Sequence, residues 1–502
     1  MGLTNLEGRK NRISSPVLGV LLLGGALFFV RLGDGVLVED PARYAAVAKS
    51  ILATGDWITM HIGREPYFNK PPLVFWLTAL LFKALGVSVA AARFWSALAG
   101  AGSLILVYDL ARSLAGPRAG VFSAVVLGLT NDFLRYVSAG RLDGPQVFFM
   151  CLAVWGFMRI RAGRSRWWGL LPGAAVGLGF LAKGPMTLFI LPALVLAALW
   201  SREARLRLGA PFRLGILLGA ALALPWFSAV AARNPEFLDR HFRHEMIGRL
   251  QGDWLSTKRR PDFVRVLLVH DLPWTPFALA GIWMAVGALR PAGGSMEKRH
   301  APEREAASAS SPEDRLGAAK LLLAWTGSLL LAVFIPPRMY GRYLVPLYPP
   351  LAILSAFALL KVVPARAAAH LERRLGLYAL LLALGIFLMP RERHQSDEKY
   401  GILEMAPLIR EWVPPGEKLP LYFADGLRAP EAVAFFYFDR EGEFLKNAEA
   451  ALETPSPLVL TSKGGLELLK PLGFQCLLER ERLLLAGRDQ SASPRSRAAF
   501  PP

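Results

Sequence analysis

The chain has few cysteines and little charge. Its 502 residues include only two cysteines, and 19% of them are charged whereas 53% are hydrophobic. Cys151 lies in an apolar run and Cys476 in a more polar C-terminal part, so no intramolecular disulfide is expected, and neither has the spacing of a zinc site. Redox chemistry is therefore not indicated.

The sequence also lacks internal repeats and a cleavable leader. We find no repeated segment and no paired halves along the chain. The first apolar segment has no convincing small-residue cleavage site, so we expect it to remain as a signal anchor.

Long apolar runs dominate what is present. Each has close to the ~20 residues that cross ~30 Å of hydrocarbon. The chain therefore reads as an all-α polytopic membrane protein of about 12 or 13 helices. The candidate segments are 16–31, 72–87, 91–111, 119–137, 145–160, 167–183, 185–200, 211–231, 264–289, 317–336, 343–362 and 373–390.

Basic residues gather in the short connectors. A net charge of +19 could indicate nucleic acid binding, but Lys and Arg cluster at 9–12, 112–118, 159–166, 202–207 and 366–374. This is the positive-inside pattern, which assigns these connectors to the cytoplasm. It places outside the membrane the loops 32–71 and 232–263, the 337–342 turn and the C-terminal segment.

One parity conflict remains in this topology. A loop that is outside at residue 71 and a connector that is inside at residue 112 require an odd number of crossings, yet two apolar segments lie between them. Either 72–87 is re-entrant, or the 112–118 connector is external and a later segment is split.

The polar parts define the remaining organisation. Residues 1–390 form the predicted transmembrane domain, and within it 291–316 reads as a flexible cytoplasmic loop. Beyond it, short helix and strand patterns predict a small external α/β domain over 391–490. Its expected elements are a helix at 400–413, strands at 419–424, 432–438 and 457–461, a helix at 464–471 and a strand at 482–486. The tail 491–502, rich in Ser, Arg and Pro, is predicted to be disordered.

The external loop 32–71 is the candidate site, because a simple connector needs none of its many charges. Asp40 followed by Pro41 predicts a helix start, and Gly55 predicts its end. An apolar stripe between them predicts an amphipathic helix on the membrane surface, with Arg43, Lys49 and Ser50 facing elsewhere. Asp40 is then either an N-cap only or, with Glu39 beside it, a base or ligand. Arg43 and Tyr44 project one turn later on the same side.

Lys70 precedes two prolines, which hold it in an extended stretch at the interface. It is either a lysine that reaches from a helix end to the interface, or a point charge for the phosphate of a lipid substrate.

Together these motifs resemble a known family. Glu39-Asp40-Pro-Ala-Arg43-Tyr44 and Tyr67-Phe-Asn69-Lys70-Pro-Pro are similar to motifs of the bacterial aminoarabinose lipid A transferases and the related protein O-mannosyltransferases. These are integral-membrane glycosyltransferases that use polyprenyl-phosphate sugars. Further matches follow in family order at 141–145, 183–185, 244–249, 271–274 and 342–349. The resemblance implies the C-type glycosyltransferase fold with an external C-terminal α/β domain.

The resemblance also implies roles for individual residues. Asp40 would be the catalytic carboxylate, with Asp143 as a second acidic residue facing the site. Lys70, Arg249 and Tyr343 would hold the donor phosphate. The remaining pocket residues would be Glu39, Arg43, Tyr44, Tyr67, Asn69 and Arg342. Such a reaction needs a base for the acceptor proton and cations for the departing phosphate, and this set supplies both.

Asn69 is one departure from the family pattern. The aminoarabinose branch has a glutamate here, which with the histidine matched by His244 can bind a metal. An amide oxygen is a poorer ligand for most divalent ions, so no cofactor is firmly expected and a site at His244 and Asn69 would be weak. The same departure argues against aminoarabinose as the sugar.

Three further features have simpler interpretations. Lys183, before Gly184-Pro185, reads as an interfacial cap in preference to a ligand, and Trp167-Trp168 as part of an aromatic belt. His241 reads as a solvated loop residue.

The expected function is inverting transfer of a sugar from a polyprenyl-phosphate donor to lipid A or another envelope glycolipid, at the periplasmic face of a bacterial inner membrane. The alternative is transfer to protein, with no nucleic acid partner in either case. A flippase of lipid-linked sugars would place ionisable residues at mid-membrane and show paired halves, neither of which we see. A scaffold without activity would not need Asp40, Lys70 and Arg249.

Overall fold

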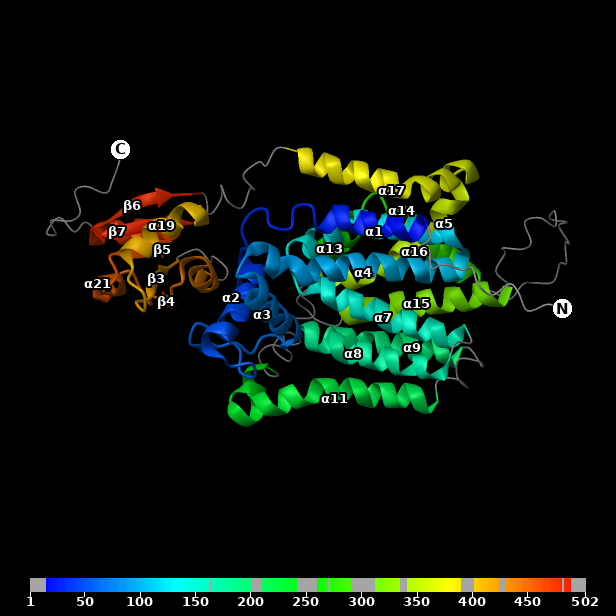
Figure 1. Cartoon of the computed structure of the whole chain (residues 1–502), viewed down its shortest axis with the longest axis horizontal. Coiled ribbons are helices and arrows are strands. Elements are labelled where there is room, and N and C mark those ends of the chain that lie inside the picture. The colour runs from blue at the N-terminus through cyan, green and yellow to red at the C-terminus, as the bar shows by residue number, and fades with distance from the viewer. Residues whose placement is uncertain are drawn as a thin grey trace, which may run out of the picture. The chain divides into compact units, whose positions relative to one another are not determined.

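The computed structural model describes residues 15–162, 165–200, 209–241, 260–269, 271–289, 312–334, 341–389, 401–423, 430–480 and 483–488. The chain forms two compact units, whose helices and strands are labelled in Figure 1. The helical unit comprises Met1–Leu32, Asn69–Val74 and Phe94–Leu388, and the mixed unit comprises Gly33–Phe68, Phe75–Arg93 and Met389–Pro502.

Helices make up nearly all of the described helical unit. They are α1 (Ser15–Phe28), α4 (Val89–Ala115, from Phe94 on), α5 (Pro117–Leu129), α6 (Asn131–Ser138), α7 (Asp143–Arg161), α8 (Leu170–Lys183), α9 (Ile190–Leu199), α11 (Ala210–Arg233), α13 (Arg260–Val269), α14 (Thr275–Gly287), α15 (Pro312–Phe334), α16 (Tyr348–Val362) and α17 (Ala365–Leu388). Short 3-10 helices cover Arg166–Gly169, Pro185–Phe189 and Gly341–Leu347.

Several helices have the length and composition of membrane spans. Among the described residues, four segments are long and apolar enough to cross: Val89–Ala115, Ala210–Arg233, Leu316–Phe334 and Gly341–Val362. Shorter apolar helices lie at Ser15–Phe28, Leu73–Leu85, Pro117–Leu129, Pro185–Leu199 and Thr275–Gly287. The polytopic helical class predicted from composition is confirmed.

Two of the predicted segments are broken. Segment 119–137 is two helices, because Thr130 between α5 and α6 has extended backbone and its Oγ1 donates to the carbonyl of Val126 at 2.9 Å. Segment 264–289 is also two helices, with Asp271–Trp274 as a turn before α14. Pro273 in that turn has no N–H for a continuous helix. Hydropathy averages over such breaks, which is why composition alone missed them.

Helices α8 and α11 lie side by side and approach through glycines. A Cβ placed on Gly173 would lie 2.1 Å from the carbonyl carbon of Gly215, and one on Gly177 would lie 2.4 Å from the carbonyl oxygen of Gly219. Small residues at such a contact let two backbones pack closely, which is a common form of association between membrane helices.

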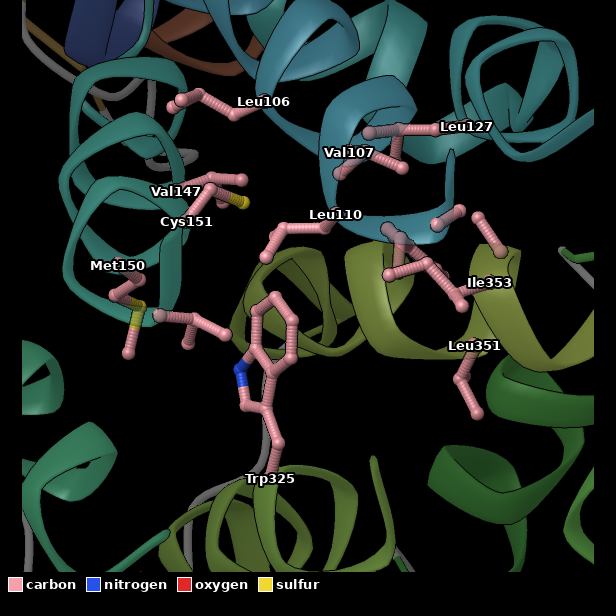
Figure 2. Packing of buried hydrophobic residues seen from close by; sticks show 14 of the residues in the cluster. Leu106, Val107, Leu110, Leu127, Val147, Met150, Cys151, Trp325, Leu351 and Ile353 are labelled. Carbon is pink, nitrogen blue, oxygen red and sulfur yellow. The ribbon is translucent and has the colours of Figure 1, made fainter. Parts of the chain in front are cut away.

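The main hydrophobic core of the helical unit includes residues of α4, α7, α15 and α16, together with others from α1, α5, α9 and α14. Figure 2 shows Trp325 of α15 pointing into this core toward Leu110 of α4 and the face of α7 that carries Met150 and Cys151. Trp325 is 1% exposed, so its side chain is buried within this core.

The mixed unit combines an N-terminal helical part with a small sheet. Its first part holds α2 (Glu39–Thr54), a hairpin of β1 (His61–Ile62) and β2 (Glu65–Pro66), and α3 (Leu73–Leu85) from Phe75 on. The C-terminal part holds α19 (Ile402–Trp412), β3 (Leu419–Tyr422), α20 (Pro430–Val433), a π-helix (Ala434–Phe438), β4 (Gly442–Phe444), α21 (Ala450–Glu453), β5 (Leu458–Thr461), α22 (Lys463–Leu469), a 3-10 turn (Lys470–Leu472), β6 (Phe474–Glu479) and β7 (Leu484–Arg488).

The five C-terminal strands form one sheet of order β4-β3-β5-β7-β6. Strand β3 is parallel to β4 and β5, whereas β7 is antiparallel to β5 and β6. The predicted small α/β region is therefore present, but the expected strand at 432–438 is wrong. Its aromatic run favours a strand by propensity. It forms helix instead, with Phe436 and Phe438 buried and the ring centroids of Phe436 and Phe82 6.3 Å apart.

Helix α2 ends as predicted but begins differently. Gly55 closes it with φ 71°, in the left-handed region that glycine adopts readily. The N-cap is Val38, in extended backbone and without a side-chain cap hydrogen bond, so the prediction of Asp40 as N-cap is wrong. Glu39 enters the helix with φ 55°, and Asp40 lies in the first turn. A positive φ at a residue other than glycine is uncommon and costly, and such residues cluster at functional sites.

Candidate functional site

The mixed unit holds Asp40 next to a permanent cation. Arg43 Nη1 lies 3.4 Å from Asp40 Oδ1, and its Nη2 lies 3.3 Å from Glu431 Oε1. Burial alone would lower the pKa of this guanidinium, but Glu431, Tyr67 and Asp40 outweigh burial and raise the pKa. A nearby opposite charge favours the ionised form of a carboxyl group, which is the form that accepts a proton. The role of Asp40 as a base stays a prediction, and the structure adds the charged partner beside it.

Two predicted pocket tyrosines meet the same aromatic ring in this unit. Tyr44 of α2 and Tyr67 lie 5.7 and 5.8 Å from Phe75, measured between ring centroids. Tyr67 is buried, and its backbone N–H donates to the carbonyl of Met60 at 2.7 Å. Glu39, Asp40, Arg43, Tyr44 and Tyr67 thus all belong to the mixed unit.

The helical unit holds the second predicted acid in a buried ion pair. Asp143 is the first residue of α7, and Lys183 is the last residue of α8. Lys183 Nζ lies 2.5 Å from Asp143 Oδ1, with the two side chains 13% and 4% exposed. The interpretation of Lys183 as an interfacial cap is therefore wrong, since its charge is taken up by a carboxylate inside the protein.

Two arginines also act on this pair. Arg141 and Arg342 both act electrostatically on Lys183. The guanidinium of Arg141 lies 5.4 Å from the ring centre of Tyr136, and that of Arg342 lies 5.9 Å from the ring centre of Tyr343.

The structure shows less about the other residues that were predicted to bind the donor phosphate or a metal. Lys70 precedes α3, and its Nζ donates to the carbonyl of Asn69 at 3.1 Å. Arg249 and His244 lie outside the described residues. Within the described ranges, no group of three or more His, Cys, Asp and Glu side chains could hold a metal ion.

His241 differs from its expected place in a solvated loop. It is 4% exposed and stacks on Phe237, with ring centroids 5.3 Å apart and planes at 18°. Phe227 covers it at 5.6 Å. The ring is thus part of an aromatic cluster at the end of α11.

A buried acidic pair was missed by sequence reasoning. Asp132 and Asp271 are 1% and 4% exposed. Tyr348 Oη donates to Asp132 Oδ2 at 3.3 Å, while Asp271 accepts from Thr130 and its Oδ1 has no hydrogen-bond partner among the described residues. Burial raises the pKa of Asp271 to about 7, and Asp132 adds to the rise. Asp271 lies in the matched 271–274 motif, which is the one signal that could have identified it.

Comparison with known proteins gives consistent matches. Residues 69–231 match the family described as dolichyl-phosphate-mannose-protein mannosyltransferase. An undecaprenyl phosphate-α-4-amino-4-deoxy-L-arabinose arabinosyl transferase of Pseudomonas aeruginosa strain LESB58 is 30% identical over 415 residues, which are 79% of this chain and 70% of the relative. The enzyme of that name from Pectobacterium carotovorum strain PC1 is 28% identical over 424 residues, 80% and 71% of the two chains.

Solved structures show the same fold. ArnT from Cupriavidus metallidurans bound to undecaprenyl phosphate superposes with a TM-score of 0.70 at 20% identity, covering 95% of this chain and 98% of that one. An oligosaccharyltransferase of Archaeoglobus fulgidus in complex with Zn and sulfate gives a TM-score of 0.57 at 15% identity, covering 96% and 74%. The chain thus has the C-type glycosyltransferase fold that its motifs implied.

Proposed function

Because the chain belongs to the family of undecaprenyl phosphate-α-4-amino-4-deoxy-L-arabinose arabinosyl transferases and is a multi-pass membrane glycosyltransferase, we propose that it uses a polyprenyl-phosphate sugar as donor. The acceptor in this proposal is lipid A or another envelope glycolipid, reached from the periplasmic face. The observation that carries the proposal is Asp40 beside Arg43, on a helix whose motifs match the family.

The proposed reaction proceeds with inversion in one displacement. The carboxylate of Asp40 takes the proton of the acceptor hydroxyl, and the hydroxyl oxygen forms a bond to the anomeric carbon. The bond from that carbon to the phosphate oxygen breaks on the opposite face, so the electron pair leaves with the polyprenyl phosphate. Lys70, Arg249 and Tyr343 are proposed to stabilise that phosphate by charge and hydrogen bonding.

Asp143 has a different proposed role from Asp40. Its carboxylate already accepts from Lys183 at 2.5 Å, so it is poorly placed to take another proton. We assign it to holding Lys183 within the cationic cluster of Arg141, Lys183 and Arg342. The gathering of these three basic side chains supports binding of an anionic part of the substrates.

A second candidate function differs from the first in its sugar and its acceptor. Asn69 in place of the family's glutamate argues for a sugar other than aminoarabinose and against a strong metal site. The match of residues 69–231 to the protein mannosyltransferase family favours transfer to protein Ser or Thr as the alternative.

The test uses purified protein in lipid with a panel of polyprenyl-phosphate sugars and envelope acceptors. Release of free polyprenyl phosphate is followed by mass spectrometry, with Asp40→Asn as the control. Release by the wild type alone supports the proposal, and the donor that reacts identifies the sugar. Movement of donor between leaflets without any release would instead indicate a flippase.

A further inference from the structure

Lys49 of α2 is bound by the π-helix of the C-terminal domain. Its Nζ donates to the carbonyls of Phe435 at 2.9 Å and Phe436 at 3.0 Å, and it also pairs with the carboxylate of Asp439. A lysine ammonium has three N–H donors, so this one site occupies all of them. The ammonium also lies 5.4 Å from the ring centre of Phe435, which adds a cation–π contribution.

A π-helix is a rare element that often marks a functional position. This one runs from Ala434 to Phe438 and ends at Asp439, which has a φ of 58°. Its geometry directs two successive carbonyls and a carboxylate at one lysine. A simple packing contact between two helices requires none of this.

Two more contacts join the same segment to α2 and its approach. Glu431 of α20 accepts from Arg43 at 3.3 Å, and Tyr437 Oη accepts from the backbone N–H of Leu37 at 2.5 Å. The contacts at Leu37, Arg43 and Lys49 fall before and after Asp40. Arg43 and Lys49 are six residues apart, which is a rise of about 9 Å along a helix. Contacts at both positions fix the position and the rotation of the helix that carries Asp40.

Resting on the proposed role of Asp40, we propose that Pro430–Asp439 of the C-terminal domain is a positioning device for the catalytic carboxylate. Glu431 is a positioning residue. It holds one arm of the Arg43 guanidinium, so that Arg43 stands at the side of Asp40 without closing on it. In this proposal Lys49 holds α2 in place, and Arg43 orients the carboxylate of Asp40.

Glu431 matters for Asp40 because the guanidinium of Arg43 lies between the two carboxylates. Its two terminal nitrogens reach two different carboxylates, at 3.4 Å to Asp40 and 3.3 Å to Glu431. Without the charge of Glu431, the guanidinium is free to form a two-pronged pair with Asp40, which is the preferred arginine–carboxylate geometry. That pair would occupy the oxygens that must accept the acceptor proton.

The test compares Glu431→Gln with Glu443→Gln in purified full-length protein. Glu443 is the matched control, since it pairs with Lys418 at 3.6 Å in the same domain and both side chains are about half exposed. Small misplacements of a catalytic group can cost up to ~100-fold in rate. We expect Glu431→Gln to lower kcat at least tenfold, with the KM for the donor and the melting temperature close to those of Glu443→Gln.

Two further variants separate the possible outcomes. Lys49→Met should also lower kcat more than it raises KM, because it removes the anchor of α2 without changing either partner of the Arg43–Glu431 pair. If Asp40→Asn is inactive while Glu431→Gln and Lys49→Met turn over within twofold of wild type, the positioning role is refuted and the catalytic proposal stands. A fall in kcat that is accompanied by a clear fall in the melting temperature would also refute the positioning role, since the two together indicate a folding defect. Turnover by Asp40→Asn would remove the proposed base itself.

Discussion

The ion pair of Asp143 and Lys183 gives the sharpest stability prediction. The charged atoms are 2.5 Å apart and the side chains are 4% and 13% exposed, so Lys183→Met leaves a carboxylate buried without its partner. Breaking a buried pair in this way typically costs about 3–5 kcal/mol, because the remaining charge loses the partner in contact with it.

Removing both charges should restore much of this loss. In Lys183→Met/Asp143→Asn the buried ion is gone, and the amide can keep part of the local hydrogen bonding. Replacing a whole buried pair by neutral groups is often close to neutral for stability. The single variant should therefore unfold more easily than either the double variant or the wild type.

The assay is the melting temperature of purified protein in detergent, read from the fraction that remains monodisperse after heating. The exposed pair of Lys470 and Glu467 is the control, because exposed pairs contribute little and Lys470→Met should leave the melting temperature nearly unchanged. A Lys183→Met variant that melts like the wild type, or a double variant no better than the single one, would refute the reasoning.

Two other predictions follow from packing and burial. Gly177→Leu should lower the melting temperature sharply, because its Cβ would lie 2.4 Å from the carbonyl oxygen of Gly219. Gly25→Ala in α1 should leave the melting temperature unchanged, because there is open space around Gly25. Equal melting temperatures of the two variants would contradict the α8–α11 contact. For Asp271, burial raises the pKa from 3.8 to about 7, so the folded state binds its proton more tightly than the unfolded state does. Stability from this group is complete at low pH and is lost as pH rises from about 4 to 7. Melting of Asp271→Asn relative to wild type should therefore improve between pH 5 and pH 8, and a constant difference would contradict the assignment.

Composition was sufficient to predict the helical class. Transfer of a segment into hydrocarbon depends on the sum over its residues, so apolar runs identify helices without any knowledge of their partners. Thr130 and the 271–274 turn escaped because a local break leaves that sum unchanged. The strand expected at 432–438 was wrong for a related reason, since propensity does not include the neighbours that Phe436 and Phe438 find.

The sequence was sufficient to name candidate site residues, but it did not reveal which side chains contact one another. Family motifs pointed to Asp40, Asp143, Lys70 and Tyr343, whose roles stay predictions. The partner of Lys183 lies 40 residues away and that of Arg43 lies 388 residues away. A polar residue on a helix has the same sequence pattern whether it meets water, a lipid headgroup or a carboxylate, so these pairs could not be read from the chain.

The bond between Lys49 and the π-helix also has a consequence for biosynthesis. The two partners are separated by 386 to 390 residues, so the ribosome must pass Asp439 before the helix of Asp40 gains its anchor. Chain growth proceeds at about 5–20 residues per second, which leaves α2 without these partners for about 20 to 80 s. A chain that ends before Asp439 lacks this anchor. Under the positioning role proposed above, full activity is therefore expected only once nearly the whole polypeptide has been made.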